Sequence, residues 1–155
     1  MFDAIKSFVV DLASGEKQAG DLADRDLRVV TAALLIHAAT VDGNMSDAEG
    51  DTLRSLLKQR FDLDDVAAGA LVDQGADADD KAVDLYRFTH LLNGSLDEKD
   101  CLRMIEMMWT VAYADGAATA FEDNLIWRVA DLLGVSSTER IALRHRAAAA
   151  RAGGA

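Results

Sequence analysis

Four acidic side chains recur at matched positions in two similar segments, and these residues are the best suited to chemistry in this sequence. Asp42 and Glu49 lie seven residues apart, and Asp115 and Glu122 repeat that spacing 73 residues later. Each Asp precedes a glycine at the expected end of one helix, and each Glu falls in the first turn of the next. Because carboxylate oxygens suit hard cations such as Ca²⁺ and Mg²⁺, the sequence predicts a divalent-cation site formed by these residues.

Helix capping is a second explanation for the same pattern. Ser46 with Glu49, and Thr119 with Glu122, fit capping boxes, in which the Glu side chain reaches back to the backbone N–H of the capping residue. Capping accounts well for the Ser, Thr and Glu residues. It accounts less well for a matched Asp before glycine, because the end of a helix disfavours negative charge. Capping alone and capping combined with a cation or polar ligand both remain open.

The first segment does not fit the EF-hand, the obvious calcium motif to test. Asp42, Asn44 and Ser46 occupy its first, third and fifth positions, but Asp47 replaces the usual glycine and Leu53 replaces the usual terminal Glu. The second segment departs further. The sequence therefore excludes an EF-hand and leaves the carboxylates as a site of another kind.

The elements that position these carboxylates are predicted to be helices. The chain of 155 residues has no Pro, its apolar residues recur at helical spacing, and no stretch alternates with the period of a strand. We expect an all-α single domain over residues 1–155 with seven to eight helices. The predicted helical segments are 2–13, 25–41, 46–61, 62–71, 83–92, 95–112, 119–133 and 136–150, with an acidic connection at 73–80.

The repeated segment predicts an internally duplicated helical hairpin. Each half would hold a long buried helix, a short glycine corner and a return helix, over approximately residues 25–61 and 98–134. Two hairpins related by a pseudo-twofold axis would bury their apolar faces together. Residues 147–155 are rich in Ala and Gly, and we expect them to form a frayed tail.

The charge and the cysteine content limit the classes of partner and compartment. A net charge of −11 disfavours binding to nucleic-acid phosphates and is compatible with cations or basic partners. Cys101 is the only cysteine, so an intrachain disulfide is excluded. The start of the chain lacks the pattern of a signal peptide, and the longest apolar run, 29–41, is too short to cross a bilayer. We expect a cytoplasmic protein without membrane insertion.

The end of the chain has the opposite charge to the rest. The only Lys or Arg residues after position 139 are four arginines, and no acidic residue follows Glu139. A basic final helix that lies against an acidic body explains this pattern. A small basic contact for an anionic partner is the alternative. The four arginines are Arg140, Arg144, Arg146 and Arg151.

Other reactive side chains lack a pattern that indicates chemistry. His37, His90 and His145 are far apart and have no metal-ligand spacing. We interpret His37 as a hydrogen-bonded core residue and Cys101 as a small core residue. The sequence has no glycine-rich phosphate loop, no nucleophile elbow and no cysteine cluster. We therefore expect no enzymatic activity.

The sequence resembles one known protein family. The motif Val-Ala-Tyr-Ala-Asp-Gly at 111–116, followed by Phe121-Glu122 and by Leu-Leu-Gly-Val at 132–135, resembles the TerB-like tellurite-resistance family. The segment from Ala32 through Asp42-Gly43 to Glu49 resembles its other half, and the resemblance covers roughly residues 25–146. It implies an all-helical duplicated domain, a link to tellurite resistance and chemical stress, and no established catalytic activity. Carried over to this chain, it implies a metal-related role for Asp42, Glu49, Asp115 and Glu122.

Together these observations predict a non-enzymatic module associated with stress and tellurite resistance. We expect it to bind a divalent cation of the Ca²⁺ or Mg²⁺ class through the duplicated acidic corners, without another cofactor. The alternative is a metal-independent scaffold for protein–protein interaction. In either case we expect a protein partner, and the resemblance implies that other tellurite-resistance components are candidates.

Overall fold

A computed structural model describes residues 24–41, 43, 45–81 and 85–153, and this part of the chain contains seven helices and no strand. The predicted all-α class is confirmed, and the expected helix at 2–13 lies outside the described residues. None of the described helices is both long and apolar enough to span a bilayer. The helices are α2 (Asp24–Thr40), α3 (Asp47–Phe61), α4 (Asp65–Lys81), α5 (Leu85–Ser95), α6 (Glu98–Ala112), α7 (Ala120–Leu132) and α8 (Ser137–Gly153).

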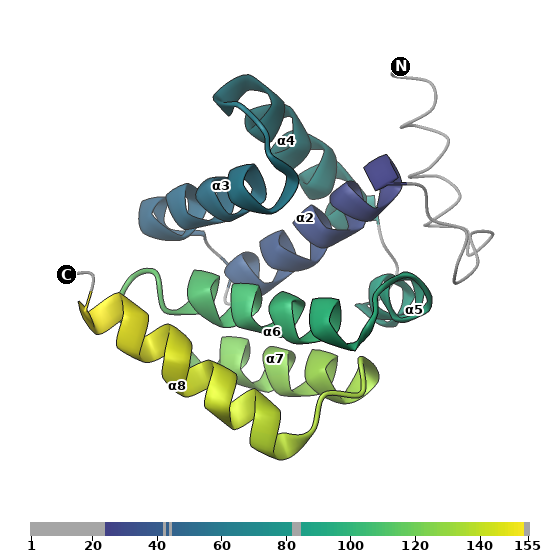
Figure 1. Cartoon of the computed structure of the whole chain (residues 1–155). Helices are drawn as coiled ribbons and strands as arrows, with labels where there is room; N and C mark the ends of the chain where they lie inside the picture. Colours follow the sequence, from purple (N-terminus) through teal and green to yellow (C-terminus); the bar gives the residue numbers. More distant parts are fainter. Residues whose placement is uncertain (1–23, 42, 44, 82–84, 154–155) are drawn as a thin grey trace.

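Helix α2 lies at the centre of the molecule, as its apolar sequence predicts. It runs between the α3–α4 pair and the group formed by α6, α7 and α8 (Figure 1). Val30, Leu34 and Leu35 are fully buried, and the helix contacts α3, α4, α5, α6 and α7. A helix that is apolar on nearly all sides is stable only when other elements cover it on all sides.

Helix α4 corrects the prediction of an acidic connection at 73–80. The helix continues to Lys81 and buries a stripe of small residues, including Ala68, Gly75 and Ala78. A Cβ atom added at Gly75 would lie 2.7 Å from the Ala32 Cβ of α2. The close approach of the two helices therefore depends on small side chains. In the sequence this pattern of small residues is hard to recognise, because acidic residues lie between the small ones.

Helix α6 is the second buried helix, and α7 and α8 pack against it. Met104, Ile105, Met108 and Trp109 are almost fully buried, and the helix packs against α2, α3, α7 and α8. Cys101 is also buried in the core, as predicted. Its burial raises the pKa of the thiol, and the neighbouring Asp100 and Asp97 raise it further.

Two further predicted helix boundaries differ from the structure. The sequence predicts that a helix begins at Ser95, but α5 includes Ser95 and the N-cap of α6 is Asp97. The Asp97 carboxylate accepts a hydrogen bond from the Asp100 backbone N–H at 2.8 Å. A serine at the N-cap would accept the same hydrogen bond. At the other end of the chain, α8 remains helical through Gly153, and the burial of Ala147 shows that this segment packs on the core.

The basic face of α8 lies against acidic residues of α6 and α7, as the first explanation of the charged tail predicts. Arg140 is almost fully buried and its guanidinium also stacks over the Trp127 ring, 4.2 Å from the centroid. The ion pairs that join α8 to the body are Arg140–Asp131 at 2.6 Å, Arg144–Asp123 at 2.9 Å and Arg146–Glu106 at 3.0 Å.

Candidate functional site

The two helix corners that carry the predicted site have the same local geometry. Gly43 follows α2 with a φ of 106°, and Gly116 follows α6 with a φ of 110°. Residues with a side chain rarely adopt this backbone conformation, which explains why each copy has a glycine here. The N-caps also match, because Ser46 has φ −71° and ψ 161° and Thr119 has φ −75° and ψ 165°. The glycines and the N-caps of the two corners thus have matching backbone conformations.

Both predicted capping boxes are complete. The Glu49 N–H donates to the Ser46 hydroxyl oxygen at 3.1 Å, and the Ser46 N–H donates to Glu49 Oε1 at 3.0 Å. In the second corner, the Glu122 N–H donates to Thr119 Oγ1 at 3.1 Å, and the Thr119 N–H donates to Glu122 Oε1 at 2.8 Å. Each box fixes one carboxylate oxygen and leaves the other oxygen, Oε2, available for a second partner.

The burial of both glutamates is the unusual feature of the site. Glu49 is 3% exposed and Glu122 is 2% exposed, whereas a Glu in the first turn of a helix normally faces water. A buried carboxylate is unfavourable unless it is paired or fully hydrogen-bonded. Glu122 Oε2 is buried and accepts no hydrogen bond within the described part of the chain. Capping therefore satisfies only half of this carboxylate.

The two glutamates face each other. The pKa of Glu122 is raised to about 7, first by burial and then by the Glu49 carboxyl, which lies within hydrogen-bonding reach. The hydrogen bonds from Thr119 act in the opposite direction. Two ionised carboxylates are both acceptors and cannot bond each other, but a proton on either one creates a donor. The corners thus bring together two carboxyl groups that need a proton or a cation between them.

Of the two predicted aspartates, the structure describes only Asp115, and it does not group this residue with the glutamate pair. Asp115 is exposed in the second corner, and Asp42 lies outside the described residues. No set of three or more His, Cys, Asp or Glu side chains among the residues that the structure describes is arranged to hold a metal ion. Of the four predicted ligands, the structure therefore brings together Glu49 and Glu122.

A contact between His37 and Asp79, near the same corners, was not predicted. His37 Nδ1 lies 2.9 Å from Asp79 Oδ1, and the His37 side chain is 36% exposed rather than buried in the core. It borders an open hollow of about 590 Å³ that Phe121 and Arg128 also line. Because Asp79 belongs to the part of α4 that the sequence predicts to be a connection, the sequence gives no signal for this contact.

Comparison with known proteins gives one match. The family model described as "Tellurite resistance protein TerB" matches residues 28–145, which include both corners. No curated protein and no solved structure matches the chain.

Proposed function

This chain belongs to the TerB family of tellurite-resistance proteins, and we propose that it is a non-enzymatic module that binds a divalent cation between Glu49 and Glu122. The observation that carries this proposal is the buried, unpartnered Oε2 of Glu122, which faces a second buried carboxyl group. Capping accounts for the other oxygen of each glutamate but gives no reason to bury both side chains together.

Electrostatics favours a cation in this position. Transfer of a carboxylate from water to the interior costs several kcal/mol, on the order of the stability of a small domain, unless an opposite charge accompanies it. A divalent ion would neutralise both glutamates and supply the missing partner for Oε2. The donor set contains only oxygen, which suits Ca²⁺ and Mg²⁺ better than the softer transition metals.

The remaining ligands must come from other groups. Two carboxylates supply about four oxygens, whereas Ca²⁺ takes about six to eight and Mg²⁺ takes about six, several of them water. Asp42 and Asp115 each stand next to the corner glycines Gly43 and Gly116. We include them in the proposal as further ligands or as charges that attract the ion, with water in the remaining positions.

Calorimetry on the full chain tests this function. Protein stripped with a chelator is titrated with Ca²⁺, Mg²⁺, Mn²⁺ and Zn²⁺ at about pH 8 and about pH 5.5, on either side of the raised pKa. We expect saturable binding of Ca²⁺ or Mg²⁺ at the higher pH and weaker binding at the lower pH, because a proton then occupies the pair. The double variant Glu49→Gln/Glu122→Gln should lose binding, and the matched control Glu139→Gln should retain it.

Two results would overturn the proposal. The first is the absence of saturable binding to the wild-type chain at the higher pH, and the second is unchanged binding in the Glu49→Gln/Glu122→Gln variant. The variant Asp42→Asn/Asp115→Asn tests the aspartates separately. If that variant binds as tightly as the wild type, the ligands are the two glutamates and water.

An exposed aromatic residue supports protein binding as a second candidate function. Phe121 is 65% exposed, although it is next to buried Glu122 and borders the hollow beside His37. Large exposed apolar residues beside a hollow are typical of contact surfaces. A partner that binds here independently of metal should be captured by immobilised wild-type chain in the presence of chelator and lost with Phe121→Ser. If capture depends on added cation, the scaffold function is wrong.

A further inference from the structure

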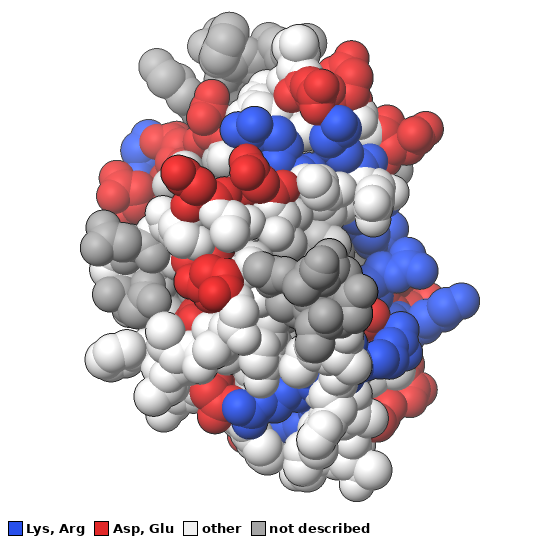
Figure 2. Space-filling model, turned by 90° about the vertical axis from the view of Figure 1, so that its left-hand side faces the viewer, with Lys and Arg blue, Asp and Glu red and all other residues white. Residues whose placement is uncertain are grey.

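A groove between α3, α6 and α8 gathers three arginines, although the chain carries a net charge of −11. The groove has a volume of about 400 Å³ and is lined by Arg60 from α3, Arg103 from α6 and Arg146 from α8. Figure 2 shows Lys and Arg side chains gathered along one edge of the molecule. None of these residues belongs to the acidic corners, so the groove is a separate site.

The guanidinium groups of the groove have spare hydrogen-bonding capacity. Arg103 makes no hydrogen bond or ion pair with any residue that the structure describes, and it is exposed. The Arg60 guanidinium makes a long contact of 3.4 Å to Asp100 and lies 5.5 Å from the centroid of the Phe61 ring, which uses none of its N–H donors. Arg146 pairs with Glu106 at 3.0 Å. An arginine has five N–H donors in a planar fork, so each of the three can still donate to a ligand.

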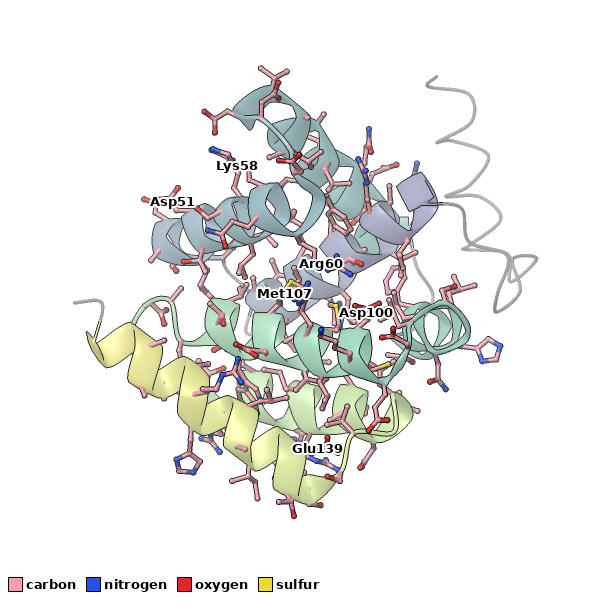
Figure 3. The ribbon with its side chains drawn as sticks, viewed as in Figure 1. Asp51, Lys58, Arg60, Asp100, Met107 and Glu139 are labelled. Atoms are coloured by element: carbon pink, nitrogen blue, oxygen red, sulfur yellow. The ribbon has the colours of Figure 1, made fainter. Side chains whose placement is uncertain are left out.

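The groove also has an apolar side. Leu56 and Met107 line it together with the arginines, and Met107 is 7% exposed. Figure 3 shows Arg60, Met107 and Asp100 close together between α3 and α6. Pockets of about 300–1,000 Å³ with apolar walls and a few convergent polar groups are the usual size and type for small molecules.

We propose that this groove binds a small organic oxyanion, a molecule that joins a phosphate or carboxylate group to an apolar body. Guanidinium groups bind both oxyanions through paired N–H···O bonds. The three arginines exceed the two nearby acids, Asp100 and Glu106, by one charge, so an anion completes the balance. Leu56 and Met107 would contact the apolar body. A basic contact for an anionic partner is the alternative explanation that the sequence leaves open for the arginines near the end of the chain. Among those that the structure describes, only Arg146 lines the groove, so this explanation applies to Arg146.

Titration of the full chain with simple probes tests this site. Phenyl phosphate and benzoate combine an oxyanion with an apolar ring, and inorganic phosphate lacks the ring. We expect saturable binding of at least one ring compound, tighter than that of inorganic phosphate. Arg103→Gln should weaken binding by about tenfold or more, since hydrogen bonds to charged groups each contribute at least that factor. Arg54→Gln, an exposed arginine of α3 outside the groove, should leave it unchanged.

A second variant gives a change in the opposite direction. Glu106→Gln removes the negative charge beside Arg146. Because Glu106 would repel an anion in the groove, the affinity for phenyl phosphate should rise several-fold, as expected for the loss of one repulsion between charges near the surface. The relative affinities of phenyl phosphate and benzoate identify the preferred oxyanion. The proposal is overturned if no ring compound binds saturably, or if Arg103→Gln and Arg54→Gln weaken binding equally, because binding would then reflect diffuse charge.

Discussion

Three of the helices that the structure describes are preceded by a Ser or Thr that is followed three residues later by Glu, but the glutamates have different environments. At the start of α8, Ser136 donates to Glu139 Oε1 at 2.9 Å, and this contact lies at the surface. Glu139, labelled near the start of α8 in Figure 3, is half-buried rather than buried. Glu49 and Glu122 are buried against each other. The comparison shows that the same local motif forms a simple surface cap or a cap whose Glu belongs to a buried carboxyl pair, according to its tertiary surroundings.

The largest expected effect that separates the two environments is a pH dependence of stability. The pKa of Glu122 is 4.5 for the free side chain and about 7 in the folded chain, so the folded state binds this proton more tightly. Its contribution, on the order of 3 kcal/mol, is therefore full below about pH 4.5 and lost as the pH rises through about 7. Urea unfolding of chelator-treated protein at several pH values measures it. Stability that stays constant across this range would contradict the pairing.

A smaller effect is expected from Glu122→Gln at about pH 8. The Gln side chain keeps the oxygen that accepts from Thr119, and its NH₂ group can donate to Glu49. We expect the free energy of unfolding to rise by about 2 kcal/mol, because the repulsion between two ionised groups is removed. Glu139→Gln should change it by less than about 0.5 kcal/mol. Equal changes in the two variants would mean that the buried pair is not ionised at this pH.

The N-cap residues should show a more modest difference. Thr119→Ala removes the side-chain acceptor for the Glu122 N–H and should lower the free energy of unfolding by about 1 kcal/mol, whereas Ser136→Ala should have about half that effect because its helix start is solvated. Thr119→Ala should also raise the pKa of Glu122 further, since the Thr119 side chain lowers it, whereas the hydrogen bond from the Thr119 backbone N–H is kept. Thermal unfolding and a pH series on both variants measure these changes, and equal losses would show that burial adds nothing to the caps.

Much of the local structure was predictable because it depends on near neighbours in the sequence. The capping boxes at Ser46 and Thr119 and the glycine corners follow from residue types within a few positions. The helical segment at 73–80 was missed because Gly75 and Ala78 pack by being small, which a search for large apolar residues does not detect. Asp97 was missed as a cap because Ser95 offered an equally good local pattern.

The central feature of the site could not be predicted in the same way. That Glu49 and Glu122 belong to matching corners is visible in the sequence, but their contact depends on how α3 and α7 pack around α2 and α6. The sequence pattern also does not indicate that both glutamates are buried. The groove of Arg60, Arg103 and Arg146 likewise joins three helices that are distant in the sequence, and only Arg146 was noted as part of an unusual charge pattern.

Proton release on cation binding tests the central claim most directly. Calorimetric titration of the wild-type chain with Ca²⁺ or Mg²⁺ at about pH 7, in two buffers with different ionisation enthalpies, measures the protons released for each ion bound. If the cation and the proton compete for the Glu49–Glu122 pair, binding should release a substantial fraction of one proton, and Glu122→Gln should abolish the release. Binding without proton release, or no binding in either buffer, would contradict the account.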